Sequence, residues 1–330
     1  MHTQPFPHES HQARHPRLIL AGKVLGGLAI VAVSVALLFQ VAPPSGIGHQ
    51  LDHLSLGWVV VSFLLELLSC LCYPVVFRRF FPEPPPAVSI RVAWIAMGAG
   101  AVLPGGNIAS AGATGLLLRK YGIGTARLVG RCAALLMLLT LFGFLVNGIV
   151  GLALLLHAPG GPHNLFHAGG PLLVSIAVIG SATGLMCWAR RAGDGAHPAL
   201  RVVGSGVEGA WQAVLKPNPR LLGAAGFLLF DIGSLWAAGH ATGHPIGMLA
   251  LMLAYFIGYL TTLLPVPAGI GVLDAGLAGT LVLYGMKAGP AAAAVLVYHA
   301  ISIWLPAVGG LIAWVPMRRR ASVTLAPAVA

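Results

Sequence analysis

The stretch LVGRCAALLMLLTLFGFLVNGIVGLALLL, residues 128–156, decides the fold class, because Arg131 is its only charged side chain. A helix crosses the hydrocarbon core of a bilayer with about 20 apolar residues, so this stretch is long enough to span a membrane. Further stretches of similar character are residues 18–41, 56–77, 171–188, 221–238 and 291–315. Over the whole chain 57% of residues are hydrophobic and 8% are charged, whereas a soluble domain has about a quarter charged. The sequence therefore predicts an all-α, polytopic transmembrane helical bundle.

Two more apolar segments are interrupted near their middle by proline and glycine. Residues 87–118 are broken by Leu-Pro-Gly-Gly at 103–106, and residues 245–284 are broken by Leu-Pro-Val-Pro-Ala-Gly at 264–269. Proline lacks the backbone N–H and its ring clashes with the preceding helical turn, so a helix rarely continues through such a sequence. We predict a broken or re-entrant helical hairpin at each segment, which either dips into the membrane or crosses it twice.

The lysine and arginine residues orient the chain, because positively charged loops stay on the cytoplasmic side. With the N-terminus inside, only Lys287 of the 19 basic residues falls on the exterior side. A hairpin returns to the side from which it enters, so this assignment is the same whether the hairpins dip or cross. We therefore expect a multi-pass protein of the cell inner (cytoplasmic) membrane with both termini cytoplasmic. The net charge of +11 then reflects orientation and contact with anionic lipid, and no nucleic-acid partner is expected.

The order of elements repeats along the chain. A first membrane repeat at 18–156 holds two spans, a hairpin and a span, and a second at 171–315 holds the same series with a cytoplasmic linker at 190–220. The first repeat starts inside and ends outside, so the second runs upside down, as in transporters built from inverted repeats. The other parts are a disordered cytoplasmic tail at 1–17, an exterior loop at 157–170 and a cytoplasmic tail at 316–330.

Glu66 and Asp231 each fall near the middle of the second span of a repeat. With Asp274 in the second hairpin they are the expected intramembrane carboxylates. A carboxylate inside hydrocarbon is costly and normally faces an internal cavity, so each is a candidate for a functional role. The alternative is a protonated acid that is hydrogen-bonded to a neighbouring helix.

The second half of each hairpin would begin a helix near the middle of the membrane. The free N–H groups and the macrodipole of such a helix start attract an anion, and glycine lets the ligand approach the backbone. Two converging starts would suit a phosphate group. The candidate substrate-binding residues are Pro104, Gly105, Gly106, Asn107, Ser110, Pro265, Pro267, Gly269, Gly271, Asp274 and His299. The alternative is that proline and glycine only kink packed helices whose ends are capped internally.

The sequence offers no recognisable catalytic or metal-binding motif. His240 and His244 have i, i+4 spacing but lack a third ligand, so no metal is expected. The glycine-rich segments lack the Lys-Ser/Thr of a phosphate-binding loop, which argues against direct use of ATP. The cysteines, all in apolar stretches, are expected to be small core residues: Cys70, Cys72, Cys132 and Cys187. We expect no cofactor and no enzymatic activity.

The second hairpin and the last span carry a family resemblance. The run LPVPAGIGVLDA at 264–275, followed by LVYH at 296–299 and WLP at 304–306, resembles the membrane region of the lysylphosphatidylglycerol synthase family, the flippase-like group. LPGG at 103–106, with residues 116–122 after it, is similar to the same family. The resemblance implies an integral membrane protein that moves lipids or lipid-linked molecules between leaflets.

This sequence also differs from the pattern that the resemblance implies. The usual glutamate of the second hairpin is Asp274 here, and the usual arginine of the last span is His299. Bifunctional members of the family carry a soluble aminoacyl-transferase domain after the membrane part. That domain is not expected here, so synthase activity is expected to be absent.

The leading functional prediction is a lipid flippase-like protein that translocates a phospholipid or a lipid-linked phosphate-bearing molecule. Its expected partner is a membrane lipid with an anionic head group. One alternative is a secondary transporter of a small soluble anion, and another is a non-transporting partner subunit of a lipid-modifying enzyme. Coupling would use protons or the membrane potential, with Glu66, Asp231 and Asp274 as the protonatable groups.

Overall fold

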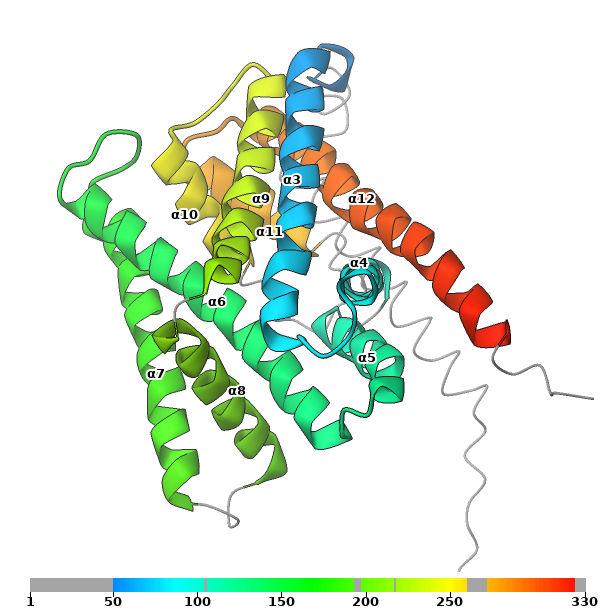
Figure 1. Ribbon diagram of the computed structural model, residues 1–330. Helices are drawn as coiled ribbons and strands as arrows, with labels where there is room; N and C mark the ends of the chain where they lie inside the picture. The colour runs from blue at the N-terminus through cyan, green and yellow to red at the C-terminus, as the bar shows by residue number, and fades with distance from the viewer. Residues whose placement is uncertain (1–49, 104–105, 193–196, 217, 260–271, 324–330) are drawn as a thin grey trace, which may run out of the picture.

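The computed structural model describes residues 50–103, 106–192, 197–216, 218–259 and 272–323, and within these ranges the chain forms helices and turns without strands (Figure 1). The predicted first span at 18–41, the tail at 1–17 and the second break at 264–269 lie outside these ranges. The helices are α3 (Leu56–Phe80), α4 (Pro86–Val102), α5 (Asn107–Leu118), η1 (Arg119–Tyr121), α6 (Thr125–Leu155), η2 (Leu165–Gly169), α7 (Gly170–Ala192), α8 (Pro198–Leu215), η4 (Pro219–Leu221), α9 (Leu222–Ala241), α10 (Met248–Tyr259), α11 (Val272–Leu283) and α12 (Ala288–Val323). The predicted all-α class is confirmed.

Five helical stretches of the described part are long and apolar enough to cross a membrane. They are Leu56–Phe80, Thr125–Leu155, Leu165–Arg191, Pro219–Ala241 and Ala288–Met317. Each overlaps a span expected from the sequence. Their large apolar side chains often face outward, as Leu173 and Leu311 do at 65% and 64% exposure, which suits contact with lipid tails. The polytopic membrane class is therefore confirmed.

Helices α3 and α9 lie side by side in the bundle (Figure 1). Their close approach depends on Gly223 of α9. A methyl group there would lie 2.7 Å from the carbonyl oxygen of Cys72 and 2.7 Å from the amide nitrogen of Val76. Small residues let membrane helices bring their backbones together, so a side chain at this position would force the two helices apart.

Two serine hydroxyls of α3 cross this contact. Ser62 Oγ donates to the carbonyl oxygen of Ser234 at 2.9 Å. Further along, Ser69 Oγ donates to the carbonyl oxygen of Phe227 at 2.7 Å. Interhelical hydrogen bonds add to van der Waals packing in a membrane, so α3 and α9 are joined at two levels.

The last helix, α12, crosses α4 with the two backbones in contact. A methyl group at Gly98 of α4 would lie 2.7 Å from the carbonyl oxygen of Pro306. A methyl group at Gly310 of α12 would lie 2.9 Å from the carbonyl oxygen of Trp94. Helix α12 also contacts α3, α9 and α11, so it packs against helices of both predicted repeats.

The two interrupted segments form pairs of short helices. Helices α4 and α5, of 17 and 12 residues, contact each other, as do α10 and α11, of 12 residues each. All are shorter than the about 20 residues of a full span. Gly106, in the first break, has a φ of +42°, a backbone conformation that favours glycine. The first break thus lies where the sequence predicts it, and the inverted repeat stays a prediction.

Helix α8 has no counterpart among the predicted spans, because it lies within the expected linker at 190–220. It packs against α6 and α7. A methyl group at Gly209 of α8 would lie 2.7 Å from Cβ of Ala134 on α6. Arg190 of α7 and Glu208 of α8 form an ion pair at 2.8 Å. Much of the linker is therefore a packed helix.

Candidate functional site

The two intramembrane acids of α3 and α9 lie together. Glu66 and Asp231 meet across the contact between these helices, with their carboxyl groups close enough to share a hydrogen bond. Glu66 is 4% exposed and Asp231 is partly buried. We call these two residues the carboxyl pair. The close packing at Gly223 and the serine bonds of α3 place both acids at the same level of the bundle.

Asp231 is held by two tyrosines from other helices. The Tyr298 hydroxyl of α12 donates to Oδ1 at 2.8 Å, and the Tyr255 hydroxyl of α10 donates to Oδ2. Both tyrosines are buried. Hydrogen bonds to an ionised acceptor are stronger than neutral ones, so this arrangement suits a carboxylate at Asp231.

The Glu66 carboxyl has weaker partners. The thiol of Cys70, one turn further along α3, lies 4.0 Å from Oε1. The Ser234 hydroxyl is within reach of the same carboxyl and lies 3.0 Å from the Ser62 hydroxyl. Oε2 of Glu66 is buried and receives no hydrogen bond from a hydroxyl or N–H group of the described residues. Buried acceptors are normally paired, so Glu66 is the incompletely satisfied member of the pair.

His299 is the predicted site residue that the structure places beside the carboxyl pair. It follows Tyr298 on α12, is 6% exposed, and interacts electrostatically with Asp231. We call Glu66, Asp231, Tyr255, Tyr298 and His299 the polar cluster.

The start of α5 approaches α3 at a different level. The Ser110 side chain is within hydrogen-bonding reach of Tyr73 on α3, and its N–H donates to the carbonyl oxygen of Gly106 at 3.0 Å. Asn107 is exposed, and no described side chain caps this helix start. Tyr73 follows Glu66 by two helical turns, about 10 Å along the axis. The start of α5 therefore lies beside α3 at about two helical turns from Glu66.

The other predicted binding residues are less fully placed. Asp274 lies in the first turn of α11, and its side chain is outside the description. The rest lie outside the described residues: Pro104, Gly105, Pro265, Pro267, Gly269 and Gly271. Whether the two helix starts converge therefore stays a prediction.

Sequence reasoning missed the residues that complete the site. Tyr255 and Tyr298 supply the hydrogen bonds to Asp231, yet neither was a candidate. The one available signal was the run LVYH at 296–299, which places Tyr298 directly before His299. Tyr255 lies in a continuous apolar stretch that gives no such signal.

Outside the membrane-spanning helices, one ion pair fixes a loop. Glu83, between α3 and α4, and Arg131 of α6 approach to 2.7 Å with side chains 38% and 26% exposed. Partial burial raises the pKa of Glu83, but the hydrogen bond and the positive charge of Arg131 outweigh this effect and hold the pKa below its ordinary value of 4.5. Glu83 is therefore a structural anchor that depends on remaining ionised.

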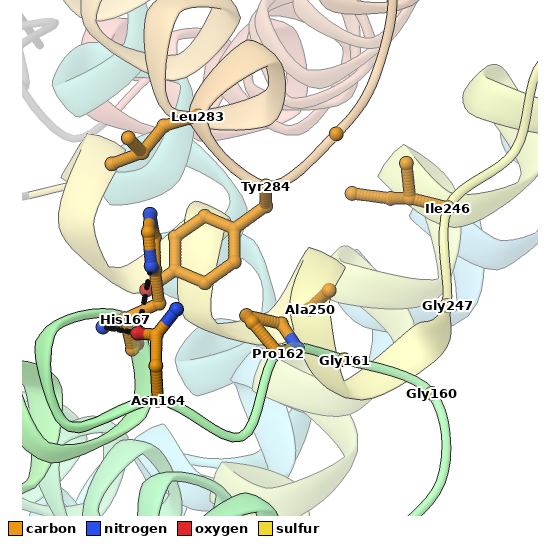
Figure 2. A pocket seen from close by; sticks show the side chains of 11 residues that line it. Gly160, Gly161, Pro162, Asn164, His167, Ile246, Gly247, Ala250, Leu283 and Tyr284 are labelled. Atoms are coloured by element: carbon orange, nitrogen blue, oxygen red, sulfur yellow. Dashed lines mark hydrogen bonds between the residues drawn. The ribbon is translucent and has the colours of Figure 1, made fainter.

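A pocket of about 440 Å³ lies between the predicted exterior loop and the ends of α10 and α11, and no residue of the polar cluster lines it. Figure 2 shows Asn164 and His167 on one side and Tyr284 beside them. The Tyr284 hydroxyl donates to the carbonyl oxygen of His167 at 2.6 Å, and the His167 N–H donates to Asn164 Oδ1 at 2.8 Å. These bonds tie the loop to the end of α11.

The family model described as the lysylphosphatidylglycerol synthase TM region matches residues 24–310. The matched region contains the whole polar cluster and both hairpins. A search of curated proteins finds no match.

Proposed function

Because this chain belongs to the family of the lysylphosphatidylglycerol synthase transmembrane region, we propose that it translocates a phospholipid or a lipid-linked phosphate-bearing molecule between leaflets. It is a multi-pass membrane protein by family and by its five apolar spanning stretches. The proposal places it in the inner membrane with both termini in the cytoplasm, as its basic residues suggest.

The polar cluster is the observation that carries the proposal. It gathers two acids, two tyrosines and a histidine from α3, α9, α10 and α12 inside an otherwise apolar bundle. Such groups are costly in hydrocarbon and normally line a functional path. A head group that crosses the membrane loses its hydration, so internal polar groups lower the free-energy cost of its passage.

The start of α5 supports an anionic head group. Its N–H groups lie at a glycine with positive φ, next to the hydroxyl groups of Ser110 and Tyr73. Helix starts attract phosphate through their unpaired N–H groups and dipole. We propose that this region binds the phosphate group. The polar cluster would couple transport to its energy source, which would be a proton gradient or the membrane potential.

Reconstitution in liposomes tests the proposal. Lipids with a fluorescent acyl chain and either a phosphatidylglycerol or a phosphatidylcholine head group are placed in one leaflet, and their arrival in the other is followed by chemical quenching. We expect the wild-type chain to accelerate movement of the anionic lipid, and Asp231→Ala to lose this acceleration while still inserting into the membrane.

Two results would contradict the lipid assignment. A rate of lipid movement equal to that in protein-free liposomes would show that the chain does not transport lipid. Uptake of labelled phosphate without lipid movement would favour a carrier of soluble anions. Glu83→Gln serves as the matched control, because it removes a carboxylate outside the polar cluster.

A further inference from the structure

We propose that Glu66 and Asp231 bind one exchangeable proton between them, carried on Glu66, and that this carboxyl pair is the proton-binding site of the protein. A bound proton is a property of the site itself, beyond the movement of lipid proposed above. Only the use of the proton to drive transport rests on that proposed function.

The two acids would lack a hydrogen-bond donor between them if both were ionised. The carboxyl groups are within hydrogen-bonding reach of each other, yet an ionised carboxylate can only accept a hydrogen bond. Glu66 is 4% exposed. Its Oε2 atom is buried and receives no hydrogen bond from a hydroxyl or N–H group of the described residues. A single proton on one acid supplies the missing donor, as in other pairs of carboxyl groups that share one proton.

The proton belongs to Glu66 and not to Asp231. Both oxygens of Asp231 already accept hydrogen bonds, from Tyr298 and Tyr255, which is the environment of an ionised carboxylate. Glu66 has a thiol at 4.0 Å and a serine hydroxyl shared with Ser62. The acid with fewer and weaker donors is the one that keeps its own hydrogen.

Titratable groups from three helices face the carboxyl pair. The titratable groups that face it are Cys70 of α3, Tyr255 of α10, and Tyr298 and His299 of α12. Among the residues that the structure describes, no three His, Cys, Asp or Glu side chains are arranged to hold a metal ion. A single proton between the two acids fits this geometry.

Release of the proton has a defined balance. The O–H bond of the Glu66 carboxyl breaks, its electron pair stays on Oε2, and the proton passes to a water molecule. Two negative charges then face each other across a contact that Ser62 and Ser69 hold on both sides. Because α3 and α9 are clamped, the change in charge acts on α10 and α12 through the hydroxyls of Tyr255 and Tyr298.

Infrared spectroscopy of the full chain in liposomes tests the site without any transport measurement. A protonated carboxyl has a carbonyl band distinct from that of a carboxylate, and the band shifts when H₂O is replaced by D₂O. We expect the wild-type chain to show such a band, to shift it in D₂O, and to shift it when glutamate is labelled with ¹³C at its side-chain carboxyl. If no band responds to the glutamate label, the proposal is overturned.

Variants locate the band on the pair. Glu66→Gln should abolish the label-sensitive band, and Asp231→Asn should move or abolish it because the acceptor of the shared hydrogen changes. Glu83→Gln should leave it as it is. A band that survives Glu66→Gln, or that is identical after Asp231→Asn, rules out the shared proton. If a variant fails to fold, the labelled wild-type protein still tests the proposal, because the absence of a glutamate-sensitive band overturns it.

A second readout separates this inference from the proposed function. In liposomes with an imposed pH gradient, wild-type lipid movement should respond to the gradient, whereas movement by Glu66→Gln should not. A glutamate band with no lipid movement would support the proton site and contradict the proposed flippase function. Lipid movement without the band would support the flippase function and overturn the proton site.

Discussion

Tyr298 of α12 donates a 2.8 Å hydrogen bond to Oδ1 of Asp231 on α9. The same helix α12 crosses α4 by contact of backbones, near Gly98 and Pro306. One helix therefore connects Asp231 with α4 of the first hairpin. A change at the carboxyl pair can reach the start of α5, which we assign to the phosphate, through α12 and α4.

Tyr298→Phe removes this donor and leaves Tyr255 as the remaining hydroxyl on Asp231. A hydrogen bond to a charged group contributes about 1.5–3 kcal/mol, so we expect a loss of unfolding free energy in that range and a slower movement of lipid. Thermal unfolding in detergent and the liposome assay measure the two effects. Tyr284→Phe is the control, because it removes a bond to a backbone carbonyl outside the polar cluster and should lower stability alone. Equal transport by wild type and Tyr298→Phe would detach this tyrosine from function.

Gly223→Ala tests the contact between α3 and α9. The added methyl group would lie 2.7 Å from backbone atoms of Cys72 and Val76, which cannot rotate away. Overpacking of this kind costs about 1–3 kcal/mol, and we expect the melting temperature in detergent to fall accordingly. Gly233→Ala on the same helix is the matched control, because its methyl group would meet only the Leu65 side chain at 3.5 Å. Similar melting temperatures for the two variants would show that the helices separate more easily than described.

Gly106→Ala places a side chain where φ is +42°. Strain of this kind costs on the order of 1–3 kcal/mol, and the new methyl group stands where we expect the phosphate to approach α5. We expect reduced movement of anionic lipid with normal insertion into the membrane. Gly112→Ala lies on the same helix with nothing within 4 Å of the added group and should retain wild-type transport. Full activity of Gly106→Ala would support the alternative that this glycine only shapes the break.

The ion pair of Glu83 and Arg131 predicts a dependence of stability on pH. Because the folded-state pKa of Glu83 is below 4.5, its stabilising effect is complete above that value and is lost as pH falls through the lower folded-state pKa. The side chains are partly exposed, so the effect is within about 1 kcal/mol. The difference in melting temperature between wild type and Glu83→Gln should therefore shrink on acidification below pH 4.5. A difference in melting temperature that stays constant over this range would show that the ion pair does not stabilise the loop.

Much of the architecture followed from local composition. The span at 128–156 and the break at 103–106 are visible in the sequence because apolar length and Pro-Gly pairs act locally, and α6 and the end of α4 lie where expected. Glu66 and Asp231 were also found singly, since an acid in an apolar run stands out. The family predicted from the sequence is confirmed.

What the sequence did not reveal depends on long-range packing. Tyr255 donates to Asp231 because the fold brings α10 against α9. The apolar sequence around a tyrosine does not indicate whether it faces an acid. Helix α8 escaped prediction for a different reason. Its Arg201, Glu208 and flanking prolines resemble a soluble connection, and only its contact with α6 and α7 shows that it is packed.

The position of Cys70 supplies a built-in reporter for this bundle. Its thiol is 2% exposed and lies 4.0 Å from Glu66 Oε1, whereas Cys187 on α7 is exposed. A small water-borne alkylating reagent can modify Cys70 only when water enters the interior of the bundle. The native chain therefore carries its own gauge of when water enters the bundle, without an introduced label.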